Sequence, residues 1–278
     1  MMSSSLLVDL FGFPATLVHG DAMVLDRWRW LCSHLPRTRN GERVLEVGCG
    51  SGAFTIGAAC RGYQSLGISW DEPGVTKASQ RAAASGVAES AKFEVGDARE
   101  LDQRRDLVGQ FDIVICCETI EHILDDLRLM KALHACLKPG GRLLLTAPNR
   151  DYRAVTPSDD GPFCETETGW HVRRGYSPAM FRELCSETGF DAEDISYCSG
   201  WLSQKMTWLW RMSGRLGTPV AWLSLLPLRP LPLLLDRPIG WLKPWPGFSI
   251  CLVAYRPRFP RAAETDVNNS AQRGMRAV

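Results

Sequence analysis

Residues 43–54 read RVLEVGCGSGAF, and this stretch decides the fold. The apolar run Arg43–Val47 predicts a short buried strand. Glycines at positions 48, 50 and 52 follow, and glycine lets the backbone turn sharply and approach a ligand closely. An apolar helix is predicted from about Ala53 to Arg61, and its N-terminus would offer free N–H groups to a carboxylate or phosphate. The stretch therefore predicts a strand, a ligand-binding turn and a helix.

The same alternation of strand and helix continues along the chain. Further strands are predicted over residues 64–68, 92–95, 111–116 and 142–146, and helices over residues 72–84 and 125–136, the latter ended by Pro139-Gly140-Gly141. A helix over 177–189 and two strands over 190–197 and 248–255 complete the pattern. Alternating elements of this kind indicate an α/β fold, with helices on both faces of a largely parallel sheet.

Five segments follow from this pattern. Residues 1–40 are expected to form an N-terminal helical segment, with a helix from Asp21 to Leu35, and residues 41–200 the ligand-binding α/β domain. Residues 201–246 are expected to be a helical insertion rich in Trp, Leu and Pro, placed before the last strand at 247–256. Residues 257–278 are polar and lack an apolar period, so we expect a disordered tail.

Composition points to a cytoplasmic protein. The 278 residues are 45% apolar with a net charge of +1, so overall charge favours neither nucleic acid nor an acidic partner. The ten cysteines include no C-x-x-C pair, and we expect reduced, mostly buried thiols. The opening MMSSSLLVDLFG has no basic region or cleavage site, so no signal peptide is expected.

The glycine-rich turn alone fits two kinds of ligand. Gly48, Gly50 and Ala53 satisfy G-x-G-x-x-A, a dinucleotide pattern. However, Glu46 would repel a pyrophosphate and would attract an ammonium group. Dinucleotide sites also use an acid at the end of the second strand, where this chain has Ser69. The turn therefore favours an amino-acid-like ligand.

Glu46 to Gly52, read as E-x-G-x-G-x-G, resembles the first motif of class I S-adenosylmethionine (SAM)-dependent methyltransferases. Later motifs come in that family's order: GDA at 96–98, FDIVICCETIEHI at 111–123, LKPGGRLLLTAPN at 137–149, and a segment at 171–190 typical of small-molecule members. The resemblance covers roughly residues 40–200. It implies a Rossmann-like methyltransferase sheet and SAM as the cofactor.

The resemblance also implies a set of cofactor-binding residues. Asp97 would recognise the adenine amino group. Glu118 and Glu121 would either hydrogen-bond the methionine portion or orient a neighbour. The expected cofactor-binding residues are Glu46, Gly48, Cys49, Gly50, Gly52, Ser69, Trp70, Asp97, Ala98, Cys117 and Glu118.

The chain departs from the family at the ribose position. Ser69 stands where the family has an acid that holds the ribose hydroxyls. Asp71, two residues later, either reaches the ribose or caps the next helix, and capping is the role we expect. Trp70 either lies against adenine or belongs to the core.

Two histidines are the expected catalytic residues, because a general base is needed where the acceptor must lose a proton. His122 follows the fourth strand and His171 lies in a long polar loop, whereas His19, His34 and His134 fall in helical stretches. His122 also fits a helix-start residue without a catalytic role. Arg173 and Arg174 either bind an acidic substrate group or are solvated. The acidic residues of the long loop, Asp159, Asp160, Glu165 and Glu167, predict a solvated lid, and no metal site is expected.

The insertion at 201–246 holds six of the ten Trp, and six basic residues against one acid, Asp236. Its uncharged run Leu216–Leu228 is only 13 residues long and contains prolines, whereas a spanning helix needs about 18. Three interpretations remain open: a cap over the sheet or active site, a contact with a membrane surface, and an apolar acceptor pocket.

Taken together, the sequence predicts a methyltransferase that moves a methyl group from SAM to an O or N of a small, hydrophobic or lipid-linked acceptor. Two alternatives stay open: a non-catalytic SAM-binding sensor or scaffold, and an NAD(P)-dependent oxidoreductase. No nucleic-acid partner is expected, because the basic residues are interleaved with Leu and Pro. The expected location is the cytoplasm, with a peripheral position at the inner face of a membrane as its variant. The oligomeric state is left open.

Overall fold

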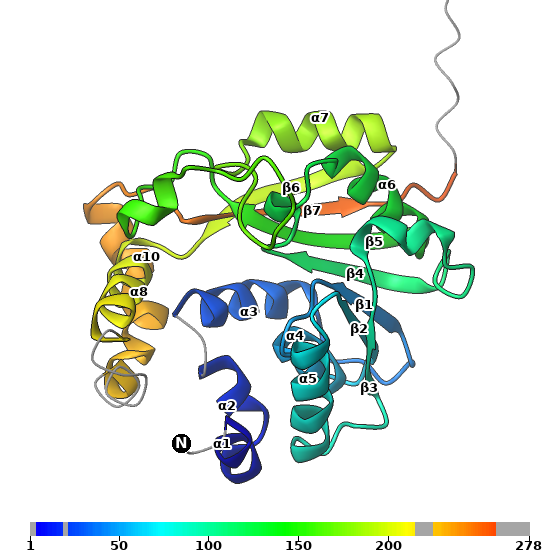
Figure 1. Ribbon diagram of the computed structural model, residues 1–278, viewed down its shortest axis with the longest axis horizontal. Coiled ribbons are helices and arrows are strands. Elements are labelled where there is room, and N and C mark those ends of the chain that lie inside the picture. Colours follow the sequence, from blue (N-terminus) through cyan, green and yellow to red (C-terminus); the bar gives the residue numbers. More distant parts are fainter. Residues whose placement is uncertain (1–3, 19–21, 215–224, 260–278) are drawn as a thin grey trace, which may run out of the picture.

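The computed structural model describes residues 4–18, 22–214 and 225–259. Its centre is a seven-stranded sheet in the order β3-β2-β1-β4-β5-β7-β6 (Figure 1). The strands are β1 (Arg43–Val47), β2 (Gln64–Ser69), β3 (Ala91–Val95), β4 (Phe111–Cys117), β5 (Leu137–Pro148), β6 (Asp191–Cys198) and β7 (Ser249–Tyr255). β1 to β5 pair in parallel, whereas β7 lies antiparallel between β5 and β6. The sheet is therefore mixed, with its parallel part where the alternating pattern predicted it.

Helices cover both faces of the sheet, which confirms the predicted fold class. α6 (Asp126–Cys136) and α7 (Pro178–Thr188) lie on one face, and α3 (Ala22–His34), α4 (Ala53–Ala59) and α5 (Glu72–Ala84) on the other (Figure 1). Each face has its own apolar core. Leu133 and Phe181 belong to the first, and Trp28, Leu31 and Phe54 to the second.

The predicted helix stop at Pro139-Gly140-Gly141 lies inside a strand. α6 ends at Cys136 and β5 begins at once with Leu137. The reason is that Leu137 pairs with Phe111, and the register then shifts between Phe111 and Ile113 before regular pairing resumes at Arg142. The Pro-Gly-Gly stretch is thus an irregularity within β5.

The N-terminal part is helical, with α1 (Ser4–Phe11), α2 (Phe13–Val18) and α3. α3 buries Met23, Arg27, Trp28 and Leu31. The predicted start of this helix, Asp21, lies outside the described residues. So do most of the predicted polar tail, from 260 onward, and residues 215–224 of the uncharged run.

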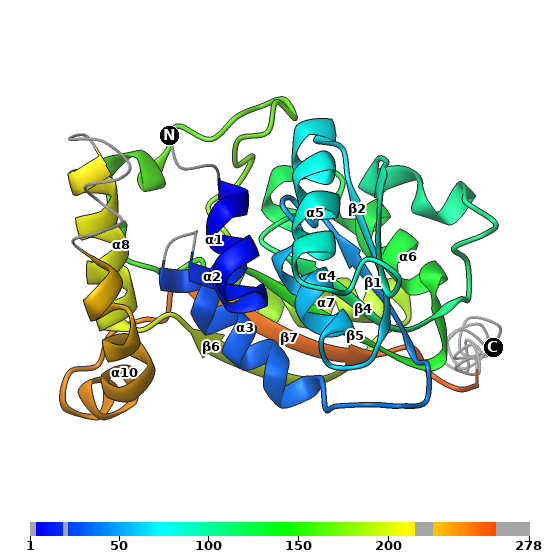
Figure 2. The same cartoon turned by 90° about the horizontal axis from the view of Figure 1, so that it is seen from below.

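Two helices connect β6 to β7 and stand at one end of the molecule (Figures 1 and 2). α8 (Trp201–Ser213) contacts both α3 and α10 (Pro230–Leu242), and a short turn at Leu226–Leu228 precedes α10. The Asp236 carboxylate accepts hydrogen bonds from the N–H groups of Leu202 and Ser203, at 2.6 and 3.1 Å, and so caps α8. In the described ranges, no helix is long and apolar enough to cross a membrane.

Candidate functional site

The glycine-rich turn sits between β1 and α4, beside β4, where the order of the parallel strands reverses. Open α/β sheets bind ligands at such a switch point. Gly48, Gly50 and Gly52 all have left-handed backbone angles, with φ of 79°, 48° and 81°. A Cβ on Gly48 would lie 2.1 Å from the Thr119 hydroxyl oxygen. The first glycine is therefore required both by its conformation and by the close approach of the residues after β4.

A cavity of about 480 Å³ opens at this point and gathers most of the predicted cofactor residues. From the predicted sets, it is lined by Gly48, Gly50, Ser69, Trp70, Asp97, Ala98, Glu118 and His122. Glu46 and Cys49 line a second cavity of about 260 Å³ on the other side of Gly48. Three predicted residues line neither cavity. Gly52 packs against Ala78 and Phe93, Cys117 is buried at the end of β4, and His171 belongs to a cluster beside the first cavity.

Glu46 is the buried acid of the second cavity. Its carboxylate accepts a hydrogen bond from the Thr55 N–H at 2.6 Å and another from the Thr55 hydroxyl. Burial raises its pKa from the ordinary 4.5 to about 7. Glu46 is thus held in place by α4, and it would ionise more readily beside a cationic ligand.

Arg27 is a residue of this site that sequence reasoning missed. It comes from α3 and lines the second cavity together with Glu46. Its guanidinium lies 3.4 Å from a carboxylate oxygen of Glu118, and both side chains are largely buried. Glu118 itself has a left-handed backbone (φ 49°), which a non-glycine residue adopts at a cost of about 1–3 kcal/mol. The turn after β4 is therefore strained at Glu118, which lines the first cavity and pairs with Arg27 of the second.

Asp97, the predicted adenine-binding acid, is bound to a neighbouring arginine. Its carboxylate accepts from the backbone N–H and from the guanidinium of Arg99, both at 2.9 Å, and this hydrogen bonding lowers its pKa. Arg99 also pairs with Glu167 from the long loop, and Glu167 accepts from the Leu124 N–H at 2.6 Å. The loop is thereby fixed over one side of the first cavity.

The structure settles the two alternatives that the sequence left open for Trp70 and Asp71, the residues just after β2. Trp70 is 72% exposed and lines the first cavity, so its core assignment is wrong. Asp71 occupies the N-cap position of α5, but its side chain makes no capping hydrogen bond. Pro73 lacks one of the N–H groups that a cap would bind. The capping role is therefore wrong, and the Asp71 side chain lines the cavity beside Ser69.

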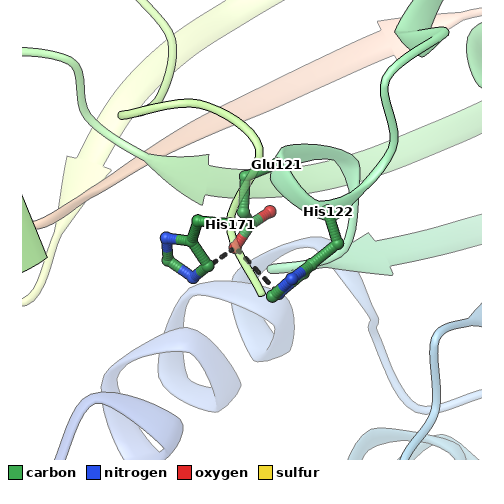
Figure 3. A group of neighbouring side chains, drawn as sticks. All are labelled: Glu121, His122 and His171. Atoms are coloured by element: carbon green, nitrogen blue, oxygen red, sulfur yellow. Dashed lines mark ion pairs between the residues drawn. The ribbon is translucent and has the colours of Figure 1, made fainter. Parts of the chain in front are cut away.

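Glu121, His122 and His171 form a cluster next to the first cavity (Figure 3). The two imidazole rings meet edge to face with centroids 4.7 Å apart, and each Nε2 lies 3.9 Å from the same Glu121 oxygen. Burial raises the pKa of Glu121, and burial together with His122 lowers that of His171. The predicted pair of histidines is thus brought together around Glu121, an acid that the sequence suggested for hydrogen bonding to the methionine portion or for orienting a neighbour. Such a set of groups can accept and share a proton, and it is also a donor set suited to a divalent metal.

The charged residues of the long loop do not stay solvated. Arg173 pairs with Asp126 and donates to the carbonyl oxygens of Ile123 and Leu124, at 2.7 and 2.8 Å. Arg174 pairs with Asp160 and donates to the Tyr152 carbonyl at 2.9 Å.

Both arginines are therefore bound within the protein, although the Arg174 side chain stays 35% exposed. The solvated-lid prediction is wrong for Asp159 and Glu167, whose largely buried side chains pair with Arg211 of α8 at 2.8 Å and with Arg99. Asp160 pairs with Arg174, but its side chain stays 54% exposed. Of the other histidines, His34 and His134 lie in α3 and α6, and His19 is outside the described residues.

Comparisons with known proteins agree with this geometry. A family model described as a methyltransferase domain matches residues 25–195. A relative from Pseudomonas aeruginosa (strain LESB58), named ubiquinone biosynthesis O-methyltransferase, is 34% identical over 159 residues, covering 56% of this chain and 67% of the relative. The chain spans about half the length of a Marinobacter nauticus relative of the same name.

Solved structures share the fold. Phosphoethanolamine N-methyltransferase 2 from Haemonchus contortus, in complex with SAM, matches with a TM-score of 0.58 and 18% identity, over 92% of this chain and 60% of that one. A SAM-dependent methyltransferase from Mesorhizobium loti matches with a TM-score of 0.53 and 19% identity, over 86% and 100%. Identities this low show a common fold and leave the acceptor open.

Proposed function

Since this chain belongs to the class I SAM-dependent methyltransferases, we propose that it transfers the methyl group of SAM to an oxygen of a small, hydrophobic or lipid-linked acceptor. The observation that carries the proposal is a pair of cavities that share Gly48 and are linked by the Arg27–Glu118 ion pair, with the His122 and His171 cluster beside the larger cavity. The choice of oxygen is supported by the name of the P. aeruginosa relative.

The residues around the two cavities fit the cofactor. Asp97, Ala98 and Trp70 would hold the adenine end of SAM, and Ser69 with Asp71 would take the ribose hydroxyls. Asp71 is free for this role because its side chain does not cap α5.

The opposite charges of Arg27 and Glu46 suit the carboxylate and ammonium of the methionine end. When bound, SAM supplies a methyl group already activated by its sulfonium. These residues therefore provide alignment rather than activation of the methyl donor.

The histidine cluster would take the acceptor's proton. His122 lines the first cavity, so its imidazole is the group placed to accept a proton from an acceptor hydroxyl. Glu121 is fully buried with one oxygen 3.9 Å from each histidine Nε2. Burial raises the pKa of Glu121, and an imidazolium formed at His122 would favour the ionised carboxylate, which in turn would stabilise that imidazolium. His171 packs its ring against that of His122 and fixes its orientation. The reaction step assigned to this chain is thus general-base catalysis at His122.

An SAH-release assay tests the proposal. Purified protein is incubated with SAM and phenols of increasing alkyl chain length, and S-adenosylhomocysteine (SAH) is measured. We expect phenol-dependent SAH release, and a His122→Asn variant that keeps its affinity for SAH while losing about 100-fold or more in kcat. Release with amines but with no phenol would contradict the oxygen acceptor. Unchanged kcat in His122→Asn would contradict the general base.

A hydrophobic or lipid-linked acceptor would also influence where in the cell the protein works. We infer a cytoplasmic protein that works peripherally at the inner face of a membrane, because such an acceptor resides there. The insertion of α8 and α10 supports this location by its Trp and basic residues.

A further inference from the structure

The outward face of α10 is apolar and uncovered. Leu234, Trp241 and Leu242 are 70%, 86% and 88% exposed, and their spacing of seven and eight residues places them on one side of the helix. Pro232 is buried on the opposite side, from which Asp236 reaches α8. A surface helix of a soluble protein normally shows the reverse arrangement, with its apolar side inward. Burying these three side chains against a partner would therefore remove an unfavourable exposure.

Basic side chains lie on α10 and just beyond its C-terminal end, around Trp245. Around the Trp245 ring lie Arg153, Lys205 and Lys243, at 4.3, 5.1 and 5.6 Å from its centroid. Arg237 lies exposed on α10 itself. Throughout residues 4–18, 22–214 and 225–259, no carboxylate lies within the 4.0 Å of an ion pair from any of these four cations. The one acid of the segment, Asp236, is occupied in capping α8.

From this juxtaposition we propose that the outer face of α10 docks on an anionic phospholipid membrane. Leu234, Trp241 and Leu242 enter the boundary between headgroups and acyl chains, where Trp is favoured. Arg237 and Lys243 then lie at the level of the lipid phosphates. A second copy of this chain is a less suitable partner for this face, because pairing two such faces would bring their positive charges together.

The surface needs no spanning helix, and the described helices include none. The docking proposal rests on the proposed peripheral location, and it does not depend on which acceptor is methylated. α10 projects at the end of the molecule away from β3, as Figures 1 and 2 show, so a membrane could meet it without displacing the sheet.

Flotation with vesicles tests the docking. The full chain is mixed with vesicles of phosphatidylcholine alone or with 30% phosphatidylglycerol at low salt. We expect binding to the anionic vesicles that is at least tenfold weaker in Trp241→Ala/Leu242→Ala. Removing two cations in Arg237→Gln/Lys243→Gln should weaken binding about thirtyfold, because each basic residue near such a surface contributes about a fivefold factor.

Matched controls use exposed residues elsewhere on the molecule. Phe259→Ala removes an exposed aromatic ring, and Lys131→Gln/Arg182→Gln removes two exposed cations on α6 and α7. Both should float like the wild type. SAH titration of every variant separates the two proposals, since docking variants should bind SAH normally.

Several results would overturn the docking proposal. These are the absence of flotation of the wild type, loss of flotation equally in the control variants, and a concentration-dependent dimer abolished by Trp241→Ala without any vesicle binding.

Discussion

Glu46 gives the sharpest test of the cofactor site, because its charge should be needed for binding yet unfavourable for folding. Burial raises its pKa to about 7, so near neutral pH about half of the free protein carries Glu46 protonated. If an ammonium group binds only the ionised form, the apparent Kd is multiplied by one plus the ratio of protonated to ionised Glu46. That ratio is about ten at pH 6 and about one tenth at pH 8, so affinity should fall roughly tenfold between pH 8 and pH 6.

The Glu46→Gln variant should weaken cofactor binding without destabilising the folded protein. The amide oxygen can still accept the hydrogen bonds from Thr55, but the charge-assisted contact to an ammonium is lost, at a cost of roughly 1.5–3 kcal/mol or about 10- to 150-fold in Kd.

The negative charge of Glu46 should favour cofactor binding but destabilise the folded protein. With a pKa raised from 4.5 to about 7, the folded state takes up a proton, and the ionised group costs about 3 kcal/mol above pH 7, a cost that disappears as the pH falls toward 4.5. Glu46→Gln should therefore be more stable than wild type at pH 8, by up to about 3 kcal/mol, while binding SAH more weakly.

Calorimetric titration with SAH at pH 6, 7 and 8, and urea unfolding at pH 5 and 8, measure the two effects. The exposed Glu89→Gln serves as the control for a lost surface carboxylate. The Glu46→Gln titrations should be nearly independent of pH between 6 and 8. Equal SAH affinity of the wild type at pH 6 and pH 8, or an unweakened Glu46→Gln, would refute the assignment of Glu46 to the ammonium.

Two further predictions concern stability. Gly48→Ala places a methyl group 2.1 Å from the Thr119 hydroxyl at a left-handed φ, so we expect a loss of about 2–4 kcal/mol in urea unfolding. Gly50→Ala, which meets no atom within 4 Å, should lose only about 1 kcal/mol, and equal losses would show that the contact is unimportant. Asp26, beside Ser199 and Ser203, has a pKa raised from 3.8 to about 6 by burial, so its ionised form destabilises the fold above pH 6. Asp26→Asn should be more stable than wild type by up to about 3 kcal/mol at pH 7.5 and nearly equal to it at pH 4; the same difference at both pH values would contradict this origin.

The sequence predicted the features whose causes are local. Strand β1, the three glycines and α4 follow one another within 17 residues, and each depends on its own apolar pattern or on its own backbone angle. The five parallel strands were predicted for the same reason. The antiparallel position of β7 was not, because the helical insertion between β6 and β7 leaves no periodic pattern that fixes where β7 pairs or in which direction.

The site residues divide in the same way. Asp97 and Glu118 could be placed because each belongs to a family motif that lies at the end of a predicted strand. Arg27 was missed because its partner Glu118 is 91 positions away in the chain. Asp71 was assigned to a cap because the position fits, and only the structure shows that its side chain lines the cavity.

The long loop explains why the acceptor side of the site is harder to predict than the cofactor side. Its charged residues are bound to distant elements, with Glu167 to Arg99 and Asp159 to Arg211. Arg211 belongs to α8, and α8 in turn packs against α10, the helix proposed to meet the membrane. The same helix holds the loop beside His171 and supports the docking face. The acceptor side is therefore built partly from segments outside the family motifs, although His122 and His171 lie within those motifs. Substitutions that separate α8 from the loop, unlike those in the glycine-rich turn, should therefore alter acceptor turnover while leaving SAH affinity unchanged.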